Sequence, residues 1–309
     1  MSKTAFVFPG QGSQGLGMLA DFADRTPVRQ AFQEASGALD LDLWALAQDG
    51  PQDALNRTEN TQPLLLTAGV ALWKLWEQAG GPRPALLAGH SLGEYTALTC
   101  AGVLNLGAAV RLVRTRGQLM QQAVPDGQGS MAAILGLDDD QVRQACATAA
   151  DGEVVEAVNF NAPGQVVIAG QASAVERAVA ACKEAGAKRA MPLPVSVPSH
   201  CALMKPAAER LAEHLENTNF HPAELPVINN VDVARETDPA RIRDALVRQL
   251  YCPVRWVETV QALAAEGVTT LYECGPGKVL SGLAKRIDRG LAARPLETGD
   301  AFDKALSGE

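Results

Sequence analysis

Residues 85–98 read ALLAGHSLGEYTAL: an apolar run, the turn Gly-His-Ser-Leu-Gly, and a helix-compatible segment. A strand, a Gly-x-Ser-x-Gly turn and a helix in this order predict a nucleophile elbow, although the five-residue turn alone would also fit an ordinary tight turn. Side chains have no room beside the serine, so glycines at positions 89 and 93 flank Ser91. We expect the Ser91 hydroxyl to face the amino end of the next helix, whose N–H groups stabilise a developing negative charge.

The composition excludes several classes of protein. The 309 residues are 47% hydrophobic and 20% charged, enough for one large core or for a large domain that carries a smaller one. A net charge of −8 argues against a nucleic-acid partner. The amino-terminal apolar run is too short for a signal peptide, and no run reaches the length of about 18 apolar residues that a membrane span needs. The six cysteines lack metal-ligand spacing. We therefore expect a cytoplasmic protein without a membrane partner.

The middle of the chain has a β-α-β-β-α-β order. Strands are expected over 131–135, 154–160, 165–169 and 188–193, and helices over 138–150 and 173–185. This order is that of a ferredoxin-like module. We therefore expect residues 127–194 to form a ferredoxin-like subdomain inserted into a larger domain.

The flanking segments predict that larger domain. Short apolar strands at 4–8 and 85–88 favour a buried parallel sheet. We expect residues 1–126 and 195–309 to form a large α/β domain with an α/β-hydrolase-like parallel-sheet core. Residues 295–309 show no clear pattern, so the sequence leaves the order of this tail open.

A serine nucleophile needs a base, which is usually a histidine. The chain has histidines at positions 90, 200, 214 and 221. His90 adjoins Ser91 and cannot face it within this turn, and the histidines at 214 and 221 fit solvent-exposed positions. His200 ends an extended segment stiffened by prolines, directly after the expected insertion, which makes it the preferred candidate.

The group that orients the histidine is missing from the local pattern. Hydrolases of this architecture place Asp or Glu between serine and histidine in chain order, and no clear candidate lies between Ser91 and His200. A backbone carbonyl would keep the same tautomer, and the residues alone leave this choice open. Cys201 is a weaker alternative nucleophile, because adjacent side chains on an extended segment point to opposite faces.

A second glycine-rich turn follows the first expected strand. Residues 10–15 formally match Gly-x-Gly-x-x-Gly, the dinucleotide-binding fingerprint, but residues 28–47 look helical where that site needs a strand ending in an acidic residue. A loop that brings a backbone N–H close to the elbow fits better. Leu92, which follows the nucleophile, would supply one oxyanion donor, and the Gln11 region the other.

Seven motifs together resemble a known family. They are GQGSQ at 10–14, ENTQP at 59–63, GHSLGE at 89–94, RG at 116–117, NFNAPGQ at 159–165, VPSH at 197–200 and ECGPG at 273–277. In this order they are similar to the malonyl-CoA:acyl carrier protein transacylase family of fatty acid synthesis. The resemblance extends to about residue 290.

The resemblance implies a role for each site residue. Ser91 is acylated, and His200 acts first as its base and then as an acid. The backbone N–H groups of Gln11 and Leu92 form the oxyanion hole. A main-chain carbonyl orients the histidine in this family, and the matching position is Gln249.

The resemblance also implies the substrates. Arg116 would bind the free carboxylate of the malonyl group, although the residues alone would make it a solvated helix arginine. Asn159 and Asn161 line the pocket. The partners are malonyl-CoA and an acidic acyl carrier protein, and the activated thioester needs no metal or bound cofactor. Because this chain is acidic too, a local basic patch should meet the carrier protein. The expected patch contains Lys188, Arg189, Lys285 and Arg286.

Three alternatives remain at this point. A discrete polyketide-synthase acyltransferase would use the same residues. A serine acyl hydrolase would deliver water to the acyl-serine, and a non-catalytic subunit would only bind the carrier protein.

Overall fold

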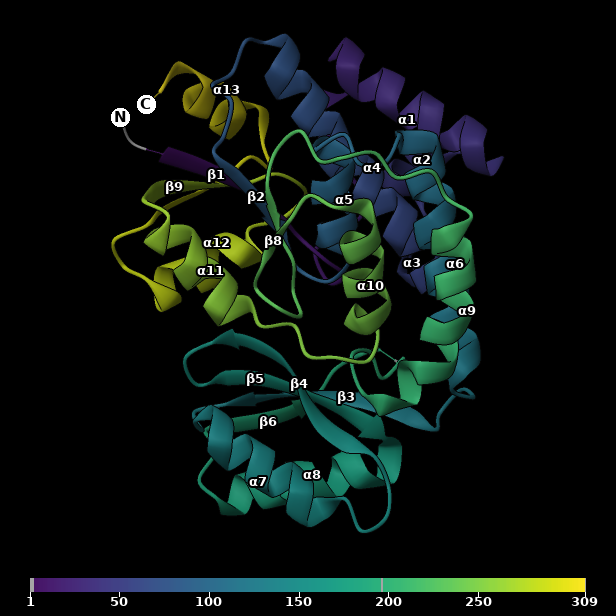
Figure 1. Cartoon of the computed structure of the whole chain (residues 1–309), viewed down its shortest axis with the longest axis vertical. Coiled ribbons are helices and arrows are strands. Elements are labelled where there is room, and N and C mark those ends of the chain that lie inside the picture. Colours follow the sequence, from purple (N-terminus) through teal and green to yellow (C-terminus); the bar gives the residue numbers. More distant parts are fainter. Residues whose placement is uncertain (1–2, 196, 309) are drawn as a thin grey trace.

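The computed structural model describes residues 3–195 and 197–308. Their strands form one six-stranded and one four-stranded sheet, and helices cover both (Figure 1). The protein is therefore a mixed α/β protein with a parallel sheet, as the sequence predicts in outline. None of the helices in these ranges combines the length and the apolarity that a bilayer-crossing segment needs.

The six-stranded sheet has the order β10-β9-β1-β2-β7-β8. Its strands are β1 (Lys3–Phe8), β2 (Leu86–Gly89), β7 (Val227–Ile228), β8 (Arg235–Glu236), β9 (Val268–Glu273) and β10 (Ala292–Pro295). All neighbouring pairs are parallel except β7 with β8. β1 pairs with β2 up to Phe8 opposite Gly89, so the loops that follow these two strands begin side by side.

Successive side chains of β1 point to opposite faces of the six-stranded sheet, and each face has its own apolar cluster. Phe6 and Phe8 pack in the cluster that contains helices α1, α4 to α6, α9, α10 and α13, whereas Ala5 and Val7 pack against α11 and α12. The helices are α1 (Thr26–Leu39), α2 (Leu43–Asp49), α3 (Gln52–Asn56), α4 (Thr58–Gln78), α5 (Leu92–Cys100), α6 (Leu106–Ala123), α9 (Lys205–Glu216), α10 (Pro239–Gln249), α11 (Trp256–Ala265), α12 (Val279–Ile287) and α13 (Gly299–Ser307), with 3-10 turns at Ala20–Phe22 and Ala202–Met204.

The four-stranded sheet is antiparallel and has the order β4-β5-β3-β6. Its elements are β3 (Gly129–Leu135), α7 (Asp139–Ala149), β4 (Val155–Ala162), β5 (Gln165–Gln171), α8 (Ala172–Glu184) and β6 (Arg189–Pro192). One face packs on α7 and α8, which lie at the lower end of the molecule in Figure 1. The other face buries Met131, Val158 and Val167 against Cys201.

The segment 295–309, whose order the sequence leaves open, contains a helix: α13 spans Gly299–Ser307. Thr298 caps α13 by accepting a hydrogen bond from the N–H of Ala301. Phe302 lies with its ring centroid 5.8 Å from those of both Phe22 and Trp76. The helix was missed because its apolar stripe is only two turns long, and its stability comes from this aromatic contact with distant residues.

Candidate active site

The turn after β2 has the geometry of a nucleophile elbow. Ser91 has φ 52° and ψ −108°, a conformation that few non-glycine residues adopt. A Cβ at Gly89 would lie 1.9 Å from the backbone of Gly93, and a Cβ at Gly93 would lie 2.0 Å from the carbonyl oxygen of Phe8. Both positions therefore require glycine, and β1 presses directly on the turn that carries Ser91.

The side chain of Asn230 supports this strained turn through hydrogen bonds. It lies in the loop after β7, and its side chain is fully buried. The Ser91 N–H donates to Asn230 Oδ1 at 2.7 Å, and Asn230 Nδ2 donates to the Gly89 carbonyl at 2.7 Å. The amide thus satisfies two backbone groups that the elbow removes from regular structure. Sequence reasoning missed Asn230. The one available signal was its place directly after a short apolar run, Val227–Ile228, and the structure shows that this run pairs with the strand of the elbow.

Ser91 and His200 form a hydrogen-bonded pair. The distance from Ser91 Oγ to His200 Nε2 is 2.8 Å. His200 Nδ1 lies 2.7 Å from the main-chain carbonyl oxygen of Gln249, which can only accept, so Nδ1 carries the proton and Nε2 is free to accept the serine proton. Burial, and then the charge of Arg116, lower the pKa of His200 to about 3. The imidazole is therefore neutral and in the tautomer of a general base.

Arg116 is buried beside this pair, which corrects its residue-level interpretation as a solvated helix arginine. Only 1% of its surface is exposed. Its Nη2 donates to Ser91 Oγ at 3.2 Å and to Gln249 Oε1 at 3.0 Å, and its Nη1 donates to Gln62 Oε1 at 2.7 Å. Burial lowers the pKa of Arg116, but a guanidinium stays charged in proteins. The site therefore holds a buried cation whose direct partners are neutral.

The loop after β1 lies against the elbow. A Cβ at Gly10 would lie 2.6 Å from the carbonyl oxygen of His90. Gln11 follows directly, and its Oε1 accepts a hydrogen bond of 2.9 Å from Thr58 Oγ1. Leu92 is the first residue of α5, where backbone N–H groups have no acceptor within the helix. Gln11 thus follows the residue that packs against the elbow, and Leu92 begins the helix that follows Ser91.

The two asparagines lie on β4. Asn161 Oδ1 is 2.8 Å from His90 Nε2, so the four-stranded sheet contacts the elbow through the residue before Ser91. Asn159 forms a parallel bridge with Val254, and its buried Oδ1 has no hydrogen-bond partner among the described residues. The structure therefore places Asn161 next to the elbow and Asn159 two residues earlier on the same strand.

The other candidate nucleophile is separated from this chemistry. Cys201 is fully buried, and its thiol donates to the Pro198 carbonyl at 3.1 Å. Burial raises the pKa of the Cys201 thiol to about 12, so almost no thiolate exists near neutral pH. His214 and His221 are exposed, as the sequence predicts.

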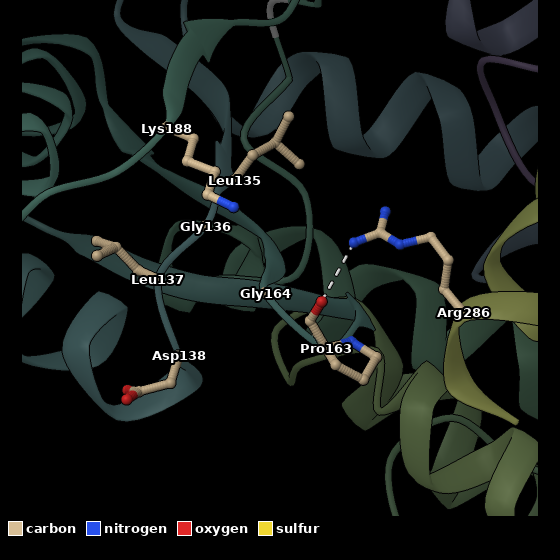
Figure 2. A pocket seen from close by; sticks show the side chains of 8 residues that line it. All are labelled: Leu135, Gly136, Leu137, Asp138, Pro163, Gly164, Lys188 and Arg286. Carbon is tan, nitrogen blue, oxygen red and sulfur yellow. Dashed lines mark hydrogen bonds between the residues drawn. The ribbon is translucent and has the colours of Figure 1, made fainter.

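A groove lies at one end of the strands of the four-stranded sheet, where β3 ends and β4 turns into β5. This groove has a volume of about 480 Å³, and its lining residues are Leu135, Gly136, Leu137, Asp138, Pro163, Gly164, Lys188 and Arg286. Arg286 on α12 donates to the Pro163 carbonyl at 3.1 Å (Figure 2). It also donates to the side chain of Gln165, and the two bonds tie α12 to the β4–β5 turn. The turn begins two residues after Asn161, so the groove lies close to the elbow without containing Ser91 or His200.

Comparisons with known proteins identify the family. The family model for the acyl transferase domain matches residues 5–290. A malonyl CoA-acyl carrier protein transacylase of Salmonella typhimurium is 62% identical over 308 residues, which covers 99% of this chain and 100% of that protein. The chain belongs to this transacylase family. The family resemblance stated from the sequence is thereby confirmed.

Solved structures agree over the same length. An acyl carrier protein S-malonyltransferase from Vibrio cholerae has 61% identity and a TM-score of 0.97, covering 98% of this chain and 100% of that one. A malonyl-transacylase solved in complex with a holo acyl-carrier protein of a type II PKS has 57% identity and a TM-score of 0.98, with 100% of both chains covered.

The neutral state of His200 links stability to pH. Its pKa is about 3 in the fold against an ordinary 6.5, so the unfolded chain binds more protons between these values. The contribution of the neutral His200 to the free energy of unfolding is therefore complete above about pH 6.5 and is lost as the pH falls towards 3. We expect the unfolding free energy, relative to that of His200→Asn, to fall by up to about 1.4 kcal/mol per pH unit in this window.

Urea unfolding of both proteins at about pH 7.5 and about pH 5 measures this change. Other titrating groups occur in both proteins and cancel in the difference. A difference that stays constant with pH would contradict a neutral His200.

Proposed function

We propose that this protein transfers the malonyl group from malonyl-CoA to the phosphopantetheine thiol of acyl carrier protein, through a malonyl ester of Ser91, in fatty acid biosynthesis. The observation that carries this proposal is the convergence of His200 Nε2 and Arg116 Nη2 on one serine oxygen, at 2.8 and 3.2 Å. His200 can activate the hydroxyl as a base, and Arg116 can bind a carboxylate beside it. This pair suits an acyl group that carries a free carboxylate of its own. The names of the full-length relatives support the same substrates.

His200 moves the proton in both halves of this reaction. Its Nε2 takes the Ser91 proton while Oγ attacks the thioester carbonyl, and it returns the proton to the departing thiolate of coenzyme A. In the second half it deprotonates the phosphopantetheine thiol, whose sulfur attacks the acyl-serine, and it protonates Oγ as the ester breaks. The Gln249 carbonyl keeps the imidazole in one tautomer. The backbone N–H groups of Gln11 and Leu92 stabilise the two tetrahedral oxyanions.

Arg116 selects the malonyl group. A planar guanidinium pairs with a carboxylate through two parallel hydrogen bonds, and Arg116 Nε has no hydrogen-bond partner among the described residues. An acetyl group would leave this buried cation without an anion. We assign Asn159 and Asn161 to the pocket wall, on the contact of Asn161 with the elbow. Because the thioester is already activated, the proposed steps need no bound cofactor.

The finer organisation of the chain belongs to the same proposal. We assign residues 127–194 to an inserted ferredoxin-like subdomain, and residues 1–126 and 195–309 to a large domain with an α/β-hydrolase-like core. The strand order β4-β5-β3-β6 with two helices on one face supports the first assignment, and the separate apolar cluster supports the boundary. A cytoplasmic location fits six cysteines that are all free.

Intact-protein mass spectrometry after brief exposure to malonyl-CoA tests the reaction. We expect one stable malonyl adduct per chain on wild type and none on Ser91→Ala. Addition of phosphopantetheinylated acyl carrier protein should then move the adduct to the carrier. Continuous release of coenzyme A without the carrier would instead indicate a hydrolase.

Arg116→Ala tests the selectivity. We expect the ratio of kcat/KM for malonyl-CoA to that for acetyl-CoA to fall by about 10³ or more, because the variant loses the cation that only malonyl needs. Steady-state transfer assays with both thioesters measure this ratio. An unchanged preference for malonyl would refute the role of Arg116.

We further propose that the acidic carrier protein docks beside the groove of Figure 2. Lys188 and Arg286 line this groove, and Arg189 and Lys285 are adjacent in the chain. The groove begins two residues from the asparagine that contacts His90, so a carrier bound there sits close to Ser91. Opposite charges steer such an encounter, and salt screens them.

Charge reversal tests this surface. In Lys188→Glu we expect the KM for acyl carrier protein to rise several-fold at low ionic strength and to approach the wild-type value in high salt, with the KM for malonyl-CoA unchanged. Arg111→Glu is the matched control, because Arg111 is exposed on α6, away from α12 (Figure 1). Equal effects of the two variants would remove the groove from consideration.

A further inference from the structure

A buried carboxylate lies behind the active site. Glu94 is on the first turn of α5, three residues after the nucleophile, and only 2% of its surface is exposed. Its Oε2 accepts hydrogen bonds from Gln249 Nε2 at 2.8 Å and from the Asn230 N–H at 2.9 Å. Burial raises the pKa of Glu94 to about 7. None of the proposed proton transfers uses this group, which therefore needs another explanation.

Glu94 and Arg116 determine the orientation of the Gln249 amide between them. A guanidinium only donates hydrogen bonds, and Glu94 Oε2 acts as an acceptor, as its bond from the Asn230 N–H shows. Gln249 must therefore turn Oε1 to Arg116 and Nε2 to Glu94, as it does at 3.0 and 2.8 Å. The same Nε2 also donates to the Ser91 carbonyl at 3.0 Å. This side chain has one orientation as long as Glu94 accepts its N–H.

Gln62 is held in the same way on the other side of Arg116. Its Nε2 donates to Thr58 Oγ1 at 2.9 Å, and its Oε1 accepts from Arg116 Nη1 at 2.7 Å. Two amide oxygens thus fix the plane of the guanidinium. Because Glu94 bonds Gln249 instead of Arg116, its negative charge does not occupy the donors that a substrate carboxylate would need.

We propose that Glu94 is a positioning residue that sets the selectivity of this site for carboxylate-bearing acyl groups, by holding Gln249 in the orientation that supports Arg116. This inference rests on the proposed function of Arg116. Without an acceptor at position 94 the Gln249 amide keeps only its bond to the Ser91 carbonyl, so its orientation is held less firmly and the support of the guanidinium weakens. Glu94 also bonds Asn230, which holds the elbow, but Ser91 serves every acyl group alike. A loss confined to malonyl therefore separates the two routes.

The experiment compares kcat and KM for malonyl-CoA and acetyl-CoA in Glu94→Ala and Glu94→Gln. In Glu94→Ala we expect the ratio of the two kcat/KM values to fall about tenfold or more in favour of acetyl, with most of the loss in the KM for malonyl-CoA. In Glu94→Gln an acceptor oxygen remains, so at least half of this loss, on a logarithmic scale, should be restored. A Glu94→Ala variant that slows both substrates equally would overturn the proposal.

Glu273→Ala is the matched control. Glu273 is another fully buried carboxylate, and its oxygens accept from the N–H groups of Leu280 and Ser281 at the start of α12. We expect it to lower thermal stability and to leave the malonyl-to-acetyl ratio within about twofold of wild type. A ratio that falls as far in this variant as in Glu94→Ala would also overturn the proposal.

Two further variants make every outcome decisive. Gln249→Met removes the amide but keeps the backbone carbonyl that orients His200, so it should reproduce the loss of selectivity even if Glu94→Ala does not fold. An unchanged ratio in Gln249→Met would overturn the proposal. Arg116→Ala reports on the underlying function. If this variant keeps the preference for malonyl, the proposed function fails. If it loses the preference while Glu94→Ala and Gln249→Met keep it, only the role of Glu94 is refuted.

Discussion

The close approach of two backbones is the constraint on which this site depends. The carbonyl oxygen of Phe8 occupies the space where a side chain at position 93 would lie, and Gly89 meets the backbone of Gly93 in the same way. These contacts require the sharp turn that puts Ser91 at φ 52°, an unfavourable conformation that must be supported by its surroundings. The parallel pairing of β1 with β2 and the amide of Asn230 supply that support.

In the mechanism that we propose, proton transfer at Ser91 relies on a neutral hydrogen-bond acceptor, the Gln249 carbonyl, behind the histidine. A main-chain carbonyl fixes the tautomer of His200 but stabilises an imidazolium less than a carboxylate would. The nearby cation shifts the balance in the same direction, because Arg116 disfavours a second positive charge on the ring. It also donates to Ser91 Oγ, where it stabilises an alkoxide. The arrangement therefore favours negative charge on the Ser91 oxygen more than it favours positive charge on the His200 ring.

The sequence predicted those parts of the site that have a local pattern. The elbow has its glycines, and His200 follows a run of prolines, so both were recognisable from neighbouring residues. Arg116 was recognisable only by family resemblance, because Arg111 on the same helix is exposed and charge alone does not reveal burial. Asn230 follows a short apolar run and Glu94 lies within the GHSLGE motif, but neither pattern reveals what these side chains contact. Their partners are backbone and side-chain groups of distant elements, which only the folded chain brings together. The broad α/β class was predictable because strands and helices have their own patterns among neighbouring residues. Helix α13 was not, because its stability depends on aromatic contacts with distant residues.

The position of β1 in the sheet has a consequence for the growing polypeptide. β1 pairs with β2 on one edge and with β9, which begins at Val268, on the other. On the ribosome the elbow segment therefore emerges long before the second neighbour of β1 and before Gln249, which orients the base. The Ser91 hydroxyl is therefore synthesised well before the groups that contact it in the fold, and the site can assemble only after most of the polypeptide has been made.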